Sequence, residues 1–122
     1  MMVRYIKERG YKGEGKDPHL TLSKIYIVHG ISFRPDSLNY PKHLYLLSDT
    51  EKDSGLWDIQ FFEFVDERVP PNWLFRDQGK GYYCLEPQEF AGDFWDDFHN
   101  GDSIAEAVFR TVIEKLNQFH TA

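Results

Sequence analysis

The chain has 122 residues, of which 41% are hydrophobic and 16% aromatic, and its formal net charge is −6. This length suits one small domain, and the aromatic content favours a folded chain over a disordered one. The acidic balance argues against nucleic acid and against anionic membranes as partners, because both attract clustered lysine and arginine. A basic protein is the natural complement of such a chain.

The chain contains one cysteine, Cys84, and so an internal disulfide is excluded. We expect Cys84 to be a small buried side chain rather than a reactive thiol. No apolar run reaches the length of a signal-peptide core or of a membrane-spanning helix. These features predict a cytoplasmic protein.

The first strand is expected at residues 3–6, and a polar loop of residues 10–18 follows it. Residues 20–33 alternate between apolar and polar side chains, which predicts a second strand. Gly30 suggests a bulge or bend within that strand. His29 lies on its apolar side and is expected to be a hydrogen-bonded residue of the sheet.

The middle of the chain predicts two more strands. Residues 34–42 contain two prolines and form a connection, and the continuous apolar run of residues 44–47 predicts a central strand. Residues 49–55 are a charged turn. Residues 57–65 are expected to form the next strand, with apolar side chains facing one way.

The last part of the chain predicts one short strand and one helix. Residues 66–73 contain adjacent prolines and end the preceding strand, and residues 82–85 predict the final strand. Ser103 is expected to cap a helix over residues 103–118, with Glu106 completing a capping box. An apolar stripe at helical spacing indicates that this helix packs on the sheet. Its residues are Ile104, Ala105, Val108, Phe109, Val112, Ile113 and Leu116.

About five short strands and a closing helix predict an α+β fold in a single domain of residues 1–122. The expected architecture is a small SH3-like β-barrel with the C-terminal helix packed on it.

Residues 81–109 form an acidic segment that contains no lysine or arginine. Unbalanced carboxylates repel one another and work against the compact state, so such a segment makes more sense if a basic partner docks there. Large aromatic side chains are interspersed and could exclude water from charge pairs. The seven carboxylates are Glu86, Glu89, Asp93, Asp96, Asp97, Asp102 and Glu106.

Two interpretations of this segment remain open. Asp96 and Asp97 are either part of a solvated turn or part of an electrostatic docking surface. Trp95, like Phe98, either packs under the helix or is an exposed anchor ringed by acids. The charged turn of residues 49–58 is a rival surface. The expected partner-binding residues are Glu89, Asp93, Trp95, Asp96, Asp97 and Asp102.

The sequence contains no complete motif for catalysis or for metal binding. A calcium loop starting at Asp96 would place Phe98 and Ala107 where oxygen ligands are needed. The five histidines are scattered, and the lone cysteine cannot complete a zinc module. No serine lies in a Gly-x-Ser-x-Gly elbow. We therefore expect no catalytic residue, no metal site and no cofactor.

Three stretches together resemble a group of small bacterial proteins. They are LTLSKIYIV at residues 20–28, FEFVDERVPPNW at residues 62–73, and FWDDF at residues 94–98 with the Gly-Asp pair that follows. Ser23 stands where that pattern has glycine. Some of these proteins resemble immunity proteins of contact-dependent growth inhibition and related polymorphic toxin systems. The resemblance implies a cytosolic protein that binds one cognate toxin domain, and many such toxins are basic nucleases.

The leading expectation is therefore a non-enzymatic immunity protein that neutralises a basic toxin by occlusion. An SH3-like adaptor or regulatory module with another protein partner is the alternative. An enzyme whose site leaves no sequence motif is the third possibility.

Overall fold

The computed structural model describes residues 1–8, 19–35, 42–49 and 54–121. The expected loop of residues 10–18, most of the connection of residues 34–42 and most of the turn of residues 49–55 lie outside these residues. The strands are β1 (Met2–Tyr5), β2 (Ile25–Phe33), β3 (Lys42–Leu47), β4 (Ser54–Asp58), β5 (Phe62–Asp66), β6 (Trp73–Gly79) and β7 (Tyr82–Pro87). The helices are the 3-10 turns η1 (Ile59–Phe61) and η2 (Gln88–Phe90), and the α-helices α1 (Phe94–His99) and α2 (Ser103–Thr121).

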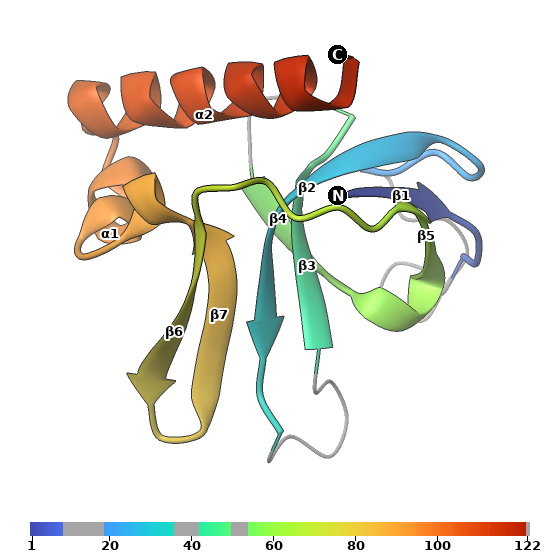
Figure 1. Ribbon diagram of the computed structural model, residues 1–122, viewed down its shortest axis with the longest axis horizontal. Helices are drawn as coiled ribbons and strands as arrows, with labels where there is room; N and C mark the ends of the chain where they lie inside the picture. Colours follow the sequence, from blue (N-terminus) through green and yellow to red (C-terminus); the bar gives the residue numbers. More distant parts are fainter. Residues whose placement is uncertain (9–18, 36–41, 50–53, 122) are drawn as a thin grey trace.

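The described strands form one seven-stranded sheet in which every pairing is antiparallel. Strand β2 is the centre of this sheet. Its first half pairs with β1 and its last residues pair with β7, while β3 pairs with most of its other edge. The register between β2 and β3 shifts between Val28 and Gly30, as the expected bulge requires. Figure 1 shows the β6–β7 hairpin and the β1–β5 pair on either side of β2 and β3.

The strand expected over residues 57–65 is wrong, because η1 divides it into β4 and β5. The Asp58 carboxylate accepts a hydrogen bond from the backbone N–H of Gln60 across 3.0 Å and so holds the turn. β4 pairs with β3, whereas β5 pairs with β1 at the other end of the strand order β4-β3-β2-β1-β5. Because three residues join these two outer strands, the sheet must curve strongly.

The α+β fold is confirmed, but the described strands do not close into a barrel, so the SH3-like barrel is not confirmed. Two elements were not expected from the sequence. β6 is an edge strand that pairs only with β7 among the described residues. α1 is a short helix that lies between η2 and α2 along the chain.

Helix α2 lies across one end of the sheet, as Figure 1 shows. The predicted helix is confirmed, and it extends to Thr121. Of the expected apolar stripe, Ala105, Phe109, Val112 and Leu116 are buried. Val108 and Ile113 are half-buried, and Ile104 is exposed. No helix within the described ranges is long and apolar enough to cross a membrane.

The predicted cap of α2 is displaced by one residue. The Asp102 carboxylate accepts a hydrogen bond from the backbone N–H of Ala105 across 2.9 Å, and Ser103 is the first helical residue. A capping box pairs the cap with the third helical residue, which here is Ala105, so Glu106 cannot complete it. The capping box of Ser103 and Glu106 is therefore wrong.

Candidate functional site

The acidic segment separates in three dimensions into paired and unpaired carboxylates. Glu86, on β7, is only 3% exposed. Arg76 on β6 donates a hydrogen bond to one oxygen of Glu86 across 2.7 Å. Burial raises the pKa of Glu86, and the hydrogen bond from Trp95 and the positive charge of Arg76 oppose that rise only in part. Glu86 therefore belongs to the interior and not to an acidic surface.

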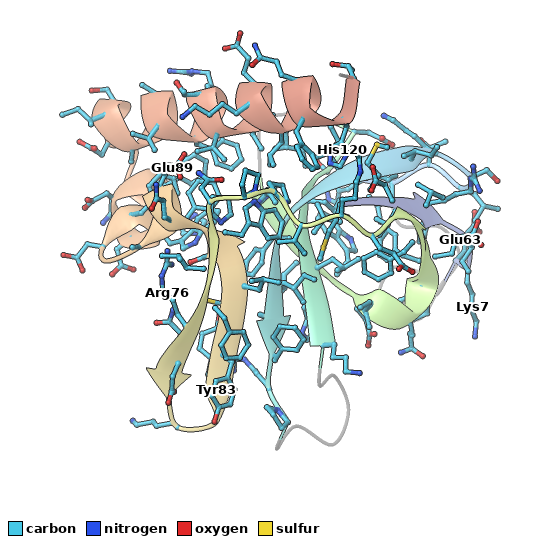
Figure 2. The ribbon with its side chains drawn as sticks, in the orientation of Figure 1. Lys7, Glu63, Arg76, Tyr83, Glu89 and His120 are labelled. Atoms are coloured by element: carbon cyan, nitrogen blue, oxygen red, sulfur yellow. The ribbon has the colours of Figure 1, made fainter. Side chains whose placement is uncertain are left out.

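The carboxylate of Glu89 has one hydrogen-bond partner and one distant cation among the described residues. It lies on η2, where one carboxylate oxygen accepts a hydrogen bond from the side-chain amide of Asn72 across 2.8 Å. The Lys115 ammonium of α2 lies 3.7 Å from the other oxygen. Figure 2 shows Glu89 between α1 and α2. The Glu89–Lys115 pair is long, and the Lys115 side chain is well exposed, so Glu89 can still bind another cation.

The remaining predicted carboxylates lie together on a short stretch of chain that we call the α1 acidic turn: Asp93, Asp96, Asp97 and Asp102. All four residues are exposed. The backbone N–H of Asp97 bonds to the carbonyl of Asp93, and that of Asp102 bonds to the carbonyl of Asp97, so the turn is compact. Asp102 also caps α2. Within the described part of the chain, Asp93, Asp96 and Asp97 make no ion pair.

Trp95 packs inward. Its indole N–H donates to the second oxygen of Glu86 across 3.2 Å, and its ring stacks on Tyr45 with centroids 5.8 Å apart. It also contacts Phe90 and Phe109 in the core. Only part of its ring reaches the surface. Of the two interpretations, the geometry favours packing under the helix, with a partly accessible ring beside the α1 acidic turn.

Beneath Trp95 lies the imidazole of His29, which is 0% exposed. Its ring meets Phe90 and Phe109 edge-on, at centroid distances of 6.0 and 5.4 Å. Burial lowers the pKa of His29 to about 3, so the ring is neutral near pH 7. This residue supports the core and has no route to a substrate in solution.

One histidine–carboxylate pair was not expected from the sequence. His120 Nδ1 lies 3.1 Å from Asp66, and its side chain is 2% exposed. The hydrogen bonds from Arg68 hold the pKa of Asp66 well below its usual range, with His120 adding to the effect. The other ring nitrogen of His120 faces the Met1 nitrogen at 3.0 Å. Figure 2 shows His120 under the C-terminal end of α2. Because both ring nitrogens are engaged and the ring is buried, this pair joins α2 to β5 and does not present a base to solvent.

The rival surface of residues 49–58 is largely engaged where it is described. Asp49 accepts hydrogen bonds from Thr21, Lys24 and Tyr26 at 2.6–2.7 Å. Burial raises the pKa of Asp49, but these hydrogen bonds outweigh it and the net pKa is lowered. Asp58 is buried at η1. Residues 50–53 lie outside the described residues.

A groove on α2 was missed by sequence reasoning. It has a volume of about 420 Å³ and lies between η2 and the first half of α2. Ile104, which is 73% exposed, stands at its N-terminal end. The groove-facing residues of α2 follow a second stripe at helical spacing, beside the core stripe, and this stripe was the available signal. The lining residues are Glu89, Ser103, Ile104, Ala107, Val108, Thr111, Val112 and Lys115.

The β6–β7 hairpin exposes a second apolar surface. Phe75 on β6 is 63% exposed and stacks on Tyr83 of β7 with ring centroids 5.7 Å apart. The ring centroid of Phe33, on β2, lies 6.2 Å from that of Phe75. We call these three residues the β6 aromatic face. Phe75 lies on the edge strand β6, whose outer edge is open among the described residues, and Tyr83 and Phe33 lie on the inner strands β7 and β2.

No group of three or more His, Cys, Asp or Glu side chains within residues 1–8, 19–35, 42–49 and 54–121 is arranged to hold a metal ion. Comparisons of the chain with protein-family models, with curated proteins and with solved structures found no match. The function is therefore inferred from the geometry and charge of the described residues and from the sequence patterns above.

Proposed function

We propose that this chain is a non-catalytic immunity protein that binds a basic toxin domain and blocks it by occlusion. The observation that carries the proposal is the α1 acidic turn. Asp93, Asp96 and Asp97 are exposed and lie close together, and they have no cationic partner among the described residues. A partner that brings lysine or arginine to this turn relieves the repulsion and forms new charge pairs.

The other carboxylates of the segment sharpen this argument. Glu86 has Arg76, and Glu89 has Lys115, each from an element outside residues 81–89. The fold thus supplies a cation for Glu86 and for Glu89 and, among the described residues, supplies none at the α1 acidic turn. The half-buried Glu106 of the same segment has no ion pair with the described residues either. That distribution suits a surface kept for a partner's charges.

The chemistry of the described residues also favours binding over catalysis. Two pairs of titratable groups that are largely buried, Glu86–Arg76 and Asp66–His120, link secondary-structure elements. Neither leaves a free acid or base facing solvent. A cytoplasmic location and a nuclease partner follow from the resemblance to immunity proteins and belong to the same proposal.

The test uses the gene immediately upstream and its C-terminal domain. That domain, expressed alone, is expected to arrest growth, and co-expression of this chain is expected to restore it. The two purified proteins should form a complex that elutes together in gel filtration. A domain that arrests growth equally with and without this chain, and shows no complex, would refute the proposal.

We also propose that β1–β5 adopt an SH3-like arrangement that remains open. The order β4-β3-β2-β1-β5, with the 3-10 turn η1 joining its two outer strands β4 and β5, supports this proposal. The alternative function, an adaptor module, is favoured by one observation, the exposed Phe75 on a strand edge that no other described strand pairs with. If Phe75→Ser abolishes binding of a partner, and replacement of the aspartates of the α1 acidic turn by asparagine does not, the adaptor hypothesis replaces the immunity hypothesis.

A further inference from the structure

We propose that the groove between η2 and α2 is the apolar part of the partner-binding surface, and that it receives an apolar side chain flanked by lysine or arginine. This inference rests on the proposed function in taking the partner to be a basic protein. The α1 acidic turn supplies the charge for binding, and the groove supplies the apolar anchor point.

The groove is built by the helical spacing of α2. Ile104, Ala107, Val108 and Thr111 recur at intervals of three and four residues, so they lie on one side of the helix. Ile104 and Ala107 are exposed and Val108 is half-buried. All three side chains are apolar, so their exposed surface forms no hydrogen bonds with water. An apolar patch rimmed by polar groups is typical of a protein-binding site.

The groove adjoins the acidic surface through the chain itself. Ser103 and Ile104, at one end of the groove, directly follow Asp102 of the α1 acidic turn. Asp102 is in turn held against Asp97 by a backbone hydrogen bond of 3.0 Å. A partner segment that places an apolar side chain against Ile104 therefore brings its neighbouring residues beside these carboxylates.

Charge complementarity identifies the occupant. Glu89 forms part of the groove wall, and its pairing with Lys115 is long and exposed. A lysine or arginine of the partner can therefore share Glu89 while the aspartates of the turn bind a second cation. An acidic or purely polar segment would leave the carboxylates unneutralised and Ile104 exposed. The volume of about 420 Å³ lies within the range of about 300–1,000 Å³ that is usual for ligand pockets.

The experiment uses a random peptide library displayed on phage and selected against the purified full chain. Selected peptides are expected to carry an apolar residue next to lysine or arginine. Ile104→Ser should weaken their binding by about tenfold or more, since a central apolar contact is lost. Glu89→Gln should weaken it less and reduce its dependence on salt. Thermal melting checks that both variants remain folded.

Phe75→Ser is the matched control, because Phe75 is also a large exposed apolar side chain but lies on the β6 aromatic face. Its binding should equal that of the parent protein. The inference is overturned if no peptide is selected, if the selected peptides lack cations, or if Ile104→Ser binds as the parent does. Loss of binding in Phe75→Ser alone would move the docking surface to β6.

This test is independent of toxin neutralisation. If peptides bind at Ile104 but the upstream domain is not neutralised, the groove stands as a docking site and the immunity function falls. If the domain is neutralised and Ile104→Ser neutralises it equally well, the function stands and the groove proposal fails.

Discussion

The indole nitrogen of Trp95 donates a hydrogen bond to Glu86 across 3.2 Å. This bond joins α1 to β7, while Arg76 of β6 binds the other oxygen of the same carboxylate at 2.7 Å. One buried carboxylate thus fixes the helix that carries the α1 acidic turn to the β6–β7 hairpin. The position of the proposed binding surface depends on a residue that does not itself belong to that surface.

Removal of the Glu86 side chain should therefore cost much more stability than removal of an exposed carboxylate. Glu86→Ala leaves the half-buried guanidinium of Arg76 without its carboxylate partner and Trp95 without an acceptor, and the expected loss is about 3 kcal/mol in the free energy of unfolding. The control is Glu63→Ala, because Glu63 pairs with Arg4 at the surface. Its loss should stay within about 1 kcal/mol. Urea unfolding measures both, and equal losses would show that the Glu86 pair does not anchor α1.

His29 should make the stability of the protein fall in mild acid. Its pKa is lowered by burial to about 3 in the folded state, whereas an exposed histidine titrates near pH 6.5. Between these values the unfolded chain takes up a proton that the folded chain does not. The free energy of unfolding should then fall by about 1.4 kcal/mol per pH unit as the pH drops from about 6 to about 4.5.

The variant His29→Leu removes this titration and should flatten that part of the stability–pH profile. Burial also lowers the pKa of His120, so a smaller slope from that residue remains in both proteins. His29→Leu can lower the free energy of unfolding at every pH, so the quantity compared between the variant and the parent is the slope of that free energy against pH. Urea unfolding at several pH values gives it, and parallel profiles would contradict the proposed cause.

Local patterns predicted the elements whose side chains face one core. The apolar stripe of α2 is such a pattern, and this helix is confirmed. A strand within residues 20–33 is also confirmed, but β2 begins only at Ile25 and is buried on both faces from Val28 to Ser32, so the predicted alternation of buried and exposed sides is wrong. The break between β4 and β5 was missed because Trp57, Ile59 and Phe61 keep the alternation through η1. β6 was missed because it is an edge strand with mostly exposed residues, so it has no buried face to produce a period of two.

The candidate site was predictable only in part, for similar reasons. The exposed aspartates of the α1 acidic turn follow one another in sequence, and their clustering could be read directly. Glu86 was wrongly grouped with them because its partner, Arg76, lies ten residues earlier on another strand. The groove was missed because Ile104 and Val108 were counted with the core stripe of α2, although Ile104 is exposed and Val108 is only partly buried.

Ser23 should be a position where glycine improves stability. Its φ is +70°, in the left-handed region, and the backbone N–H of Lys24 bonds to the carbonyl of Thr21 to close the turn. Such turns favour glycine at this position, because other residues suffer a steric cost of about 1–2 kcal/mol. Glycine also loses more entropy on folding, so the net gain for Ser23→Gly should be about 0.5–1 kcal/mol.

Thermal melting of Ser23→Gly against the parent measures this gain. The comparison variant is Gly92→Ala, because Gly92 also has a positive φ of +66° and nothing crowds a Cβ there. That variant should lose stability through the same conformational cost. A loss in Ser23→Gly would show that the serine side chain contributes a contact that outweighs its strain.

The α1 acidic turn should govern how fast the partner binds. Replacing Asp93, Asp96 and Asp97 together by asparagine keeps the size of each side chain but removes three negative charges. Association with the C-terminal domain of the upstream gene product should slow by about tenfold at low salt, because steering by opposite charges raises association rates by about 10–10³. The rate should also become less dependent on salt. Stopped-flow fluorescence at several salt concentrations measures both effects.

The matched control replaces Glu8, Glu67 and Glu114 by glutamine. These residues are also exposed, so the variant has the same net charge as the aspartate variant but retains the α1 acidic turn. If total charge steers the partner, both variants should slow association equally. If the α1 acidic turn is the docking surface, the control should keep most of the rate and of its salt dependence. Equal slowing in the two variants would remove the local argument for this turn and would leave only the overall acidity of the chain.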